Sequence, residues 1–221
     1  MEITYKETIK DSSLIGKIYG LLAISVIFAI IGNIAGLSHL QSVLFHKWLF
    51  LIGEFILILV LSFIGNNKEL QFLGFILLNV FTFLSGFTLA PLIAYALKIN
   101  PMVVVYALSV TAGTFVLMSV IGFIFKDKAL KIGTFLFAGI IALIISSLLN
   151  LFFHSSTVAL VITTLSIIIF SLYVSYNTAQ ILEADPNISP IGLTLQLYLD
   201  ILNIFVNTLQ LLLSFSKSDE Q

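Results

Sequence analysis

Seven long apolar segments constrain the fold of this chain more than any other feature of its sequence. A helix crosses a bilayer core of about 30 Å with about 17 to 25 apolar residues. Lipid offers the backbone no hydrogen-bond partners, so segments of this length are predicted to be helical. The segments are Leu14–Leu37, Trp48–Ile64, Leu70–Leu97, Met102–Phe125, Leu130–Phe153, Val158–Leu182 and Ile191–Leu213.

The composition also indicates an integral membrane protein. Hydrophobic residues make up 59% of the 221 and charged residues only 10%, too few to cover a soluble domain of this size. We therefore predict an all-α membrane protein with seven transmembrane helices. Residues 1–13 form a short N-terminal segment, 14–214 a single transmembrane domain and 215–221 a short polar tail.

The positions of the lysines predict the orientation of the chain. Short loops rich in Lys or Arg stay in the cytoplasm. With a cytoplasmic N-terminus, seven lysines lie on the inside and three on the outside. The inside set is Lys6, Lys10, Lys17, Lys68, Lys126, Lys128 and Lys131, and the outside set is Lys47, Lys98 and Lys217.

A stripe of polar side chains runs along the seventh segment. Steps of four and three residues place its members on one face of a helix. They are Gln196, Asp200, Asn203, Asn207, Gln210 and Ser214. This segment contains the most polar groups of the seven. It is therefore also the segment expected to be broken or re-entrant, if one of the seven is.

Asp200 is the most informative member of the stripe. It lies nine residues into its helix, roughly 14 Å deep and close to the membrane midplane. An ionisable group there costs about 2.5 to 3.5 kcal/mol and usually faces the protein interior or a water-filled path. Asp200 is therefore a candidate ion ligand or titrating group, and the alternative is a neutral acid that only joins helices.

The sixth segment carries a matching polar stripe. It consists of Thr163, Ser166, Tyr173, Asn177 and Gln180. An antiparallel hairpin brings Asn177 and Asp200 within about one turn of each other, and a hydrogen bond between them is predicted. An amide can donate to a carboxylate or accept from a carboxylic acid, so Asn177 tolerates both protonation states of Asp200.

Glu54, in the second segment, is another acid within a predicted span. It lies six residues from the start of that segment and therefore nearer the outer face. Two roles are open for it, a cation ligand and a structural hydrogen-bond partner. Together Asp200 and Glu54 are the candidates for transient calcium binding.

No enzyme signature is present, and we expect neither catalysis nor a cofactor. The chain has no cysteine, and neither H-E-x-x-H nor G-x-S-x-G occurs. An intramembrane aspartyl protease needs two aspartates near the midplane, where only Asp200 lies. The net charge of -1, without a basic cluster in a soluble region, argues against nucleic acid as a partner.

Four stretches give the chain a family resemblance. They are LIGE at Leu51–Glu54, FLSGFTLAP at Phe83–Pro91, SLYVSYN at Ser171–Asn177 and LYLDILNIF at Leu197–Phe205. In their order and spacing the chain resembles the Bax inhibitor family of transmembrane proteins, in its bacterial form. The resemblance covers nearly the whole chain.

The resemblance implies a seven-helix bundle with the polar seventh helix at or near its centre, placed in the bacterial inner membrane. It also implies a pH-sensitive calcium leak whose sensor is a pair of aspartates. One of the pair matches Asp200 and the other matches Asn177. Members with both aspartates tend to have an arginine near the end of the second helix, and this chain has no arginine.

Two functions follow as hypotheses. The first is a pH-influenced calcium leak, or a proton-coupled cation pathway, that uses Asp200, Asn177 and Glu54. Its supporting polar seam comprises Gln196, Asn203, Asn207, Tyr173 and Gln180. The second is a regulator of membrane protein quality control or stress survival that binds a membrane-anchored protease, as the resemblance to some bacterial relatives implies.

Overall fold

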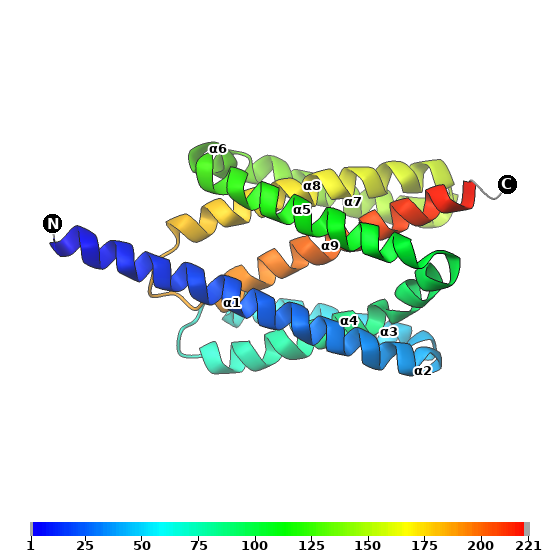
Figure 1. Cartoon of the computed structure of the whole chain (residues 1–221), viewed down its shortest axis with the longest axis horizontal. Helices are drawn as coiled ribbons and strands as arrows, with labels where there is room; N and C mark the ends of the chain where they lie inside the picture. Colours follow the sequence, from blue (N-terminus) through cyan, green and yellow to red (C-terminus); the bar gives the residue numbers. More distant parts are fainter. Residues whose placement is uncertain (1, 219–221) are drawn as a thin grey trace. The chain divides into compact units, whose positions relative to one another are not determined.

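The structure of this protein is a computed structural model that describes the backbone of residues 2–218 and the side chains of residues 14–216. All regular secondary structure in that part of the chain is helical (Figure 1). The helices are α1 (Glu2–Ser38), α2 (Leu40–Phe45), α3 (Lys47–Ile64), α4 (Gln71–Ile99), α5 (Pro101–Ile124), α6 (Lys126–Lys131), α7 (Gly133–Phe153), α8 (Ser156–Glu183) and α9 (Ile191–Ser218).

The prediction of seven membrane spans is confirmed. Seven of the described helices are long and apolar enough to cross a bilayer. Their bounds differ from the predicted ones by at most three residues, as in the fifth span, which begins at Gly133 and not at Leu130. The short helices α2 and α6 were not predicted, because six residues are too few to show a periodic pattern.

The last span, α9, is a single unbroken helix. Its 28 residues reach about 42 Å at 1.5 Å per residue, enough to cross a bilayer core of about 30 Å. It is not broken at its polar residues, and Figure 1 shows it continuous from orange to red. Among the seven spans it also has the largest buried share, 44%, as a helix at the centre of a bundle requires.

The chain divides into two compact units. Unit 1 comprises Met1–Tyr95 and Glu183–Tyr198, and unit 2 comprises Ala96–Leu182 and Leu199–Gln221. The division falls inside α4 and inside α9, so each of these helices contributes residues to both units. Asp200 and Asn177 belong to unit 2, whereas Glu54 belongs to unit 1.

Glycines let α1 and α4 approach closely in unit 1. A Cβ atom on Gly32 would collide with the backbone of Phe83, and one on Gly86 would collide with the carbonyl of Ala29. The Gly86 carbonyl also accepts a hydrogen bond of 3.1 Å from Nδ2 of Asn33. In lipid, where helices gain little hydrophobic free energy from pairing, such close backbone contact holds helices together.

The start of α9 is attached to the end of α3 in the same unit. The amide of Gly192 donates to the Gly65 carbonyl at 3.0 Å, and the amide of Ser189 donates to the Asn66 carbonyl at 3.3 Å. Further along α9, the Tyr198 hydroxyl lies 2.5 Å from Oγ of Ser85, and both side chains are buried. This Tyr198 contact satisfies a polar group that would otherwise be stranded in an apolar core.

A similar glycine contact joins α5 and α8 in unit 2. A Cβ atom on Gly122 would collide with the backbone of Ser175, and one on Gly139, in α7, would press on the Ile169 side chain of α8. These small residues bring α5 and α7 against α8. The face of α8 that carries Asn177 is thereby buried.

The two predicted terminal segments are only partly described. Residues 2–13 continue α1 toward the N-terminus, and 215–218 continue α9. Met1 and residues 219–221 lie outside the described residues. The side chains of Lys6, Lys10 and Lys217, which entered the prediction of orientation, also lie outside the described part.

We predict that Gly86→Ala destabilises the protein, whereas Gly113→Ala does not. The new methyl group of the first variant meets backbone, which cannot move aside as a side chain can, and overpacking of this kind costs about 1 to 3 kcal/mol. Gly113 is also within a transmembrane helix, but a Cβ atom there meets nothing within 4 Å. Thermal unfolding of both variants in detergent measures the difference. Equal melting temperatures would contradict the close contact of α1 and α4.

Candidate functional site

A hydrogen bond between Asn177 and Asp200 forms the centre of the candidate site. Nδ2 of Asn177, on α8, donates to Oδ2 of Asp200, on α9, at 2.6 Å. Both side chains are buried, with 4% and 3% of their surface exposed. The hydrogen bond predicted from the sequence is therefore present, and it lies within unit 2.

The local sequence explains how these two side chains meet. Asn177 lies six residues before the end of α8 and Asp200 nine residues after the start of α9, which are about 9 and 14 Å of helix. The connection between the two helices is short, so the helices run back along each other. Residues at similar distances from that connection therefore lie at similar heights along the two helices and can be in contact.

A neutral partner gives this pair a single titratable group. A buried carboxyl group without a cationic partner is favoured in its neutral form, because an ion is poorly solvated away from water. The Asn177 amide can donate to the carboxylate and to the carbonyl oxygen of the protonated acid. The pair can therefore stay together while Asp200 gains or loses a proton.

A cavity of 510 Å³ with a mixed polar and apolar lining lies in the same unit 2, although neither Asn177 nor Asp200 lines it. Its walls come from α7, α8 and α9 and contain no charged residue. Side chains capable of hydrogen bonding contribute on all three helices, and these are Ser147, Asn150, Thr163, Ser166, Asn203, Asn207 and Gln210. The sequence predicts that the polar stripes of the sixth and seventh spans can face each other. This is confirmed for Thr163 and Ser166 of the sixth span and for Asn203, Asn207 and Gln210 of the seventh, which line the same cavity.

The cavity extends from one end of these helices to the neighbourhood of Asp200. Asn150 and Leu151 lie near the end of α7, and Ala159 lies near the start of α8, so they mark the same end of the cavity. At the other end Asn203 lies three residues after Asp200, about 4.5 Å along the helix axis. The polar lining thus reaches within one helical turn of the buried acid.

The two asparagines of α9 are held by their own helix. Nδ2 of Asn203 donates to the Leu199 carbonyl, and Nδ2 of Asn207 donates to the Asn203 carbonyl, each at 2.8 Å. These bonds occupy the donor side of each amide. The acceptor side, Oδ1, is the kind of oxygen that coordinates hard cations such as calcium.

The remaining residues of the predicted seam are not all at the cavity. Tyr173 is half-buried on α8, with its ring packed edge-on against Tyr176, and Gln180 donates to the Tyr176 hydroxyl at 3.0 Å. Neither side chain lines the cavity. Gln196 is exposed and belongs to the part of α9 that lies in unit 1.

Glu54 forms a separate polar contact in unit 1. The hydroxyl of Thr88, on α4, donates to Oε1 of Glu54, on α3, at 2.6 Å, and the carboxyl group is half-buried. The sequence alone left the partner of Glu54 open. Thr88 lies within α4, three residues before Pro91, on the side of that helix that faces Glu54 of α3.

Sequence reasoning missed three polar residues that the structure makes prominent. Ser147 and Asn150 of α7 line the cavity, and Tyr198 pairs with Ser85. The signal for the first two was their spacing of three residues near the end of an apolar span. The signal for Tyr198 was a hydroxyl group deep within an apolar helix, where it needs a partner.

A cation at these sites would be held by few charged groups. No group of three or more His, Cys, Asp or Glu side chains that could hold a metal ion occurs among the described residues. Asp200 and Glu54 each bring one carboxyl group, surrounded by amides and hydroxyls. Calcium, which prefers six to eight oxygens, could be bound there only weakly and with much of its water retained.

Comparison with known proteins decides the family. The model of the family described as inhibitor of apoptosis-promoting Bax1 matches residues 11–217, nearly the whole chain. The chain belongs to the Bax inhibitor family. The resemblance drawn from its four sequence stretches is confirmed.

Several bacterial proteins are similar to this chain over almost their full length. A Helicobacter pylori protein is 36% identical over 209 residues, which is 94% of this chain and 89% of that protein. A Campylobacter jejuni protein is 34% identical over 211 residues, 93% of this chain and 90% of its own. A Vibrio cholerae protein described as a membrane protein is 27% identical, covering 97% of this chain and 95% of its own.

We predict that the Asn177–Asp200 hydrogen bond stabilises the fold by about 1 kcal/mol, the typical size for such a bond between membrane helices. A double-mutant cycle with Asn177→Leu and Asp200→Leu measures this coupling energy through unfolding in detergent. The variant Asp200→Asn keeps an oxygen acceptor, so it should retain most of the coupling. A coupling energy indistinguishable from zero would show that the pair does not hold the two helices together.

Proposed function

We propose that this Bax inhibitor family member is a pH-influenced leak pathway for cations, calcium among them, with Asp200 as its titrating group and ion ligand. The observation that carries the proposal is an uncharged cavity in which hydroxyl and amide side chains share the lining with apolar ones, and whose lining residue Asn203 lies within one turn of a buried acid. Such a carboxyl group is expensive in lipid unless protons or ions reach it. We propose no catalytic role and no cofactor for the chain.

The cavity supports this proposal because it can hold water. Its 510 Å³ has room for on the order of ten water molecules, and hydroxyls and amides line it on three helices. A cation entering from the Asn150 end would keep part of its hydration shell. It would exchange the rest for the oxygens of Asn207 and Asn203 before meeting Asp200.

Competition between a proton and a cation for Asp200 would give the pathway its pH dependence. When Asp200 is protonated it offers no charge, and the cost of dehydrating a cation is not offset. When it is deprotonated, the carboxylate attracts the cation in a medium where screening is weak. The Asn177 amide accommodates both states, so protonation does not need to break the contact of the two helices.

Glu54 is proposed as a second acid that acts in the other unit. Its half-buried carboxyl group, held by Thr88, is suited to transient contact with a cation near the outer face. One acid deep within the described spans of each unit, without a ring of charges, fits a slow leak better than a fast selective channel. We place the protein in the bacterial inner membrane with its N-terminus in the cytoplasm, on the distribution of its lysines.

We predict that calcium flux into liposomes rises with pH for the unaltered protein, because proton and cation compete for Asp200 and the carboxylate that attracts the cation becomes more populated as the pH rises. In Asp200→Asn the flux should be low and independent of pH, with a loss of about tenfold at the highest pH measured, equivalent to about 1.4 kcal/mol. Glu54→Gln should lower the flux without removing its pH dependence.

The control for these variants is Glu69→Gln, which removes an exposed carboxyl group outside the spans and should leave the flux unchanged. Fluorescence from a calcium indicator trapped in the liposomes measures the initial rate of calcium uptake. If Asp200→Asn keeps the flux and the pH profile of the unaltered protein, Asp200 is not the gate.

We predict that Asn207→Leu reduces flux by about tenfold, because it replaces a polar group on the cavity wall with an apolar one and raises the cost of bringing a hydrated ion past it. Gln196→Leu is the matched control. It also replaces an amide on α9, but that amide is exposed and lies outside the cavity wall. Equal flux in the two variants would mean that ions do not use this cavity.

A second function is supported by a different observation. Because Asn177 stands where a second acid would give a coupled pair, the site has one titratable group, and the polar contacts would also suffice to hold a scaffold together. The protein would then act by binding a membrane-anchored protease and regulating membrane protein quality control. Crosslinking in native membranes, with purification under mild detergent, separates the two functions. Stable co-purification with such a protease, together with no calcium flux, would favour this one.

A further inference from the structure

The charged residues of the segment from α5 to Leu182 of α8 are concentrated in one short helix. Between Ile99 and Leu182 the only Lys, Arg, Asp or Glu residues are Lys126, Asp127, Lys128 and Lys131. All four lie in α6, between the ends of the spans α5 and α7. Three lysines against one aspartate leave this helix with a net charge of +2.

A surface pocket lies next to these charges. It has a volume of 600 Å³ and its wall combines charged and apolar side chains. We call it the α6 pocket, and its residues are Phe123, Ile124, Phe125, Lys126, Asp127, Lys128 and Leu182. Phe123 and Ile124 end the span α5 and Leu182 is near the end of the span α8, so the pocket opens where the apolar part of the protein stops.

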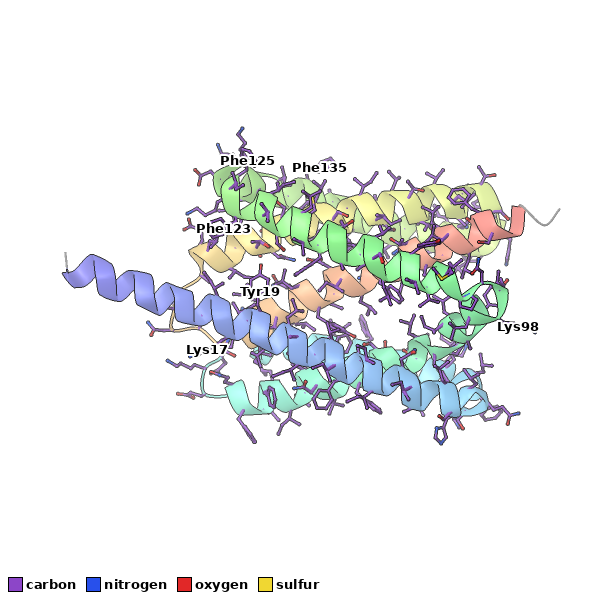
Figure 2. The ribbon with its side chains drawn as sticks, in the orientation of Figure 1. Lys17, Tyr19, Lys98, Phe123, Phe125 and Phe135 are labelled. Atoms are coloured by element: carbon purple, nitrogen blue, oxygen red, sulfur yellow. The ribbon has the colours of Figure 1, made fainter. Side chains whose placement is uncertain are left out.

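Aromatic rings surround this end of unit 2. Phe123, Phe125 and Phe135 are all at least half exposed. Figure 2 shows the three of them at the end of unit 2 that carries α6. Because they lie at or near the ends of transmembrane spans, these apolar rings are placed to contact the part of the lipid chains next to the headgroups.

The position of Lys128 suits a phosphate at that level. Its Nζ atom lies over the Phe125 ring, 5.4 Å from the ring centre, and this cation–π contact holds the ammonium group next to the apolar wall of the pocket. Ala129, the next residue, is buried and fixes α6 against the spans. The ammonium groups are therefore carried on a short, anchored helix.

We propose that the α6 pocket binds the headgroup of an anionic phospholipid such as phosphatidylglycerol, with the phosphate near Lys126 and Lys128 and the acyl chains along Phe123 and Ile124. The charge of +2 favours an anion, and the apolar wall at the end of two spans favours an anion that carries hydrocarbon chains. A soluble phosphate would gain nothing from that wall. This proposal does not depend on the leak function.

A substitution of Asp127 tests the proposal, because the direction of the change in lipid affinity is predicted. Its carboxyl group also lines the pocket and repels a phosphate, so Asp127→Asn should strengthen binding. The triple variant Lys126→Gln, Lys128→Gln and Lys131→Gln should weaken it by about tenfold or more, because each lysine near an anionic lipid contributes to attraction.

We would test this by native mass spectrometry of the full-length protein, titrated in detergent with phosphatidylglycerol or with phosphatidylethanolamine. The matched control is Lys98→Gln, which removes a lysine from the last turn of α4, before α5 begins and therefore far along the chain from α6, and should bind phosphatidylglycerol as the unaltered protein does. Unfolding temperatures of all variants confirm that the exposed glutamines leave the fold intact.

Three outcomes would overturn the proposal. They are equal binding of the two lipids by the unaltered protein, equal loss of binding in the triple variant and in Lys98→Gln, and weaker binding in Asp127→Asn. Competition by inorganic phosphate as effective as that by the lipid would likewise contradict it, since it would assign the pocket to a soluble anion. Preferential binding of phosphatidylglycerol that is lost in the triple variant and strengthened in Asp127→Asn would support it.

Discussion

Lipid supplies no hydrogen-bond partners, and this lack governs both the backbone and the polar side chains of the protein. Each backbone amide and carbonyl group within a span must be satisfied by its own helix, which is why residues so rich in Ile, Leu and Phe form long helices. Each polar side chain within a span needs a partner from another helix, from its own backbone or from water. The Asn177–Asp200 and Thr88–Glu54 hydrogen bonds meet this requirement with a partner on another helix, and Asn203 and Asn207 meet it with a carbonyl group of their own helix.

Helix pairing in both units depends on the absence of side chains. Gly32 and Gly86 bring α1 against α4 in unit 1, and Gly122 brings α5 against α8 in unit 2. In water such helices would be joined mainly by burying apolar side chains. In lipid the apolar side chains stay on the outside, as the exposed Phe63 and Phe152 do, and close contact of the backbones replaces hydrophobic burial.

The same physical argument links the structure to its proposed role. A carboxyl group buried in unit 2 beside a cavity lined with hydroxyls and amides is a costly arrangement that serves no purpose in a passive helix contact, where Asn at position 200 would suffice. Under the proposed function, access of a proton or a cation to Asp200 gives the buried carboxyl group a purpose. Because its partner Asn177 is neutral, Asp200 is the only titratable member of the hydrogen-bonded pair.

The sequence by itself determined the number and bounds of the spans, because the length of an apolar segment is a local property and the thickness of the bilayer core sets the length required. It also determined that Asn177 and Asp200 would meet, since a short connection fixes the register of two successive helices. Only the tertiary structure decided that Thr88 would hold Glu54, that Ser147 and Asn150 would join the cavity wall, and that Gln196 would be left outside it. Those outcomes depend on the rotation of each helix and on which helices lie next to it. Contacts at glycines between segments far apart in the chain set both, and no local sequence pattern encodes them.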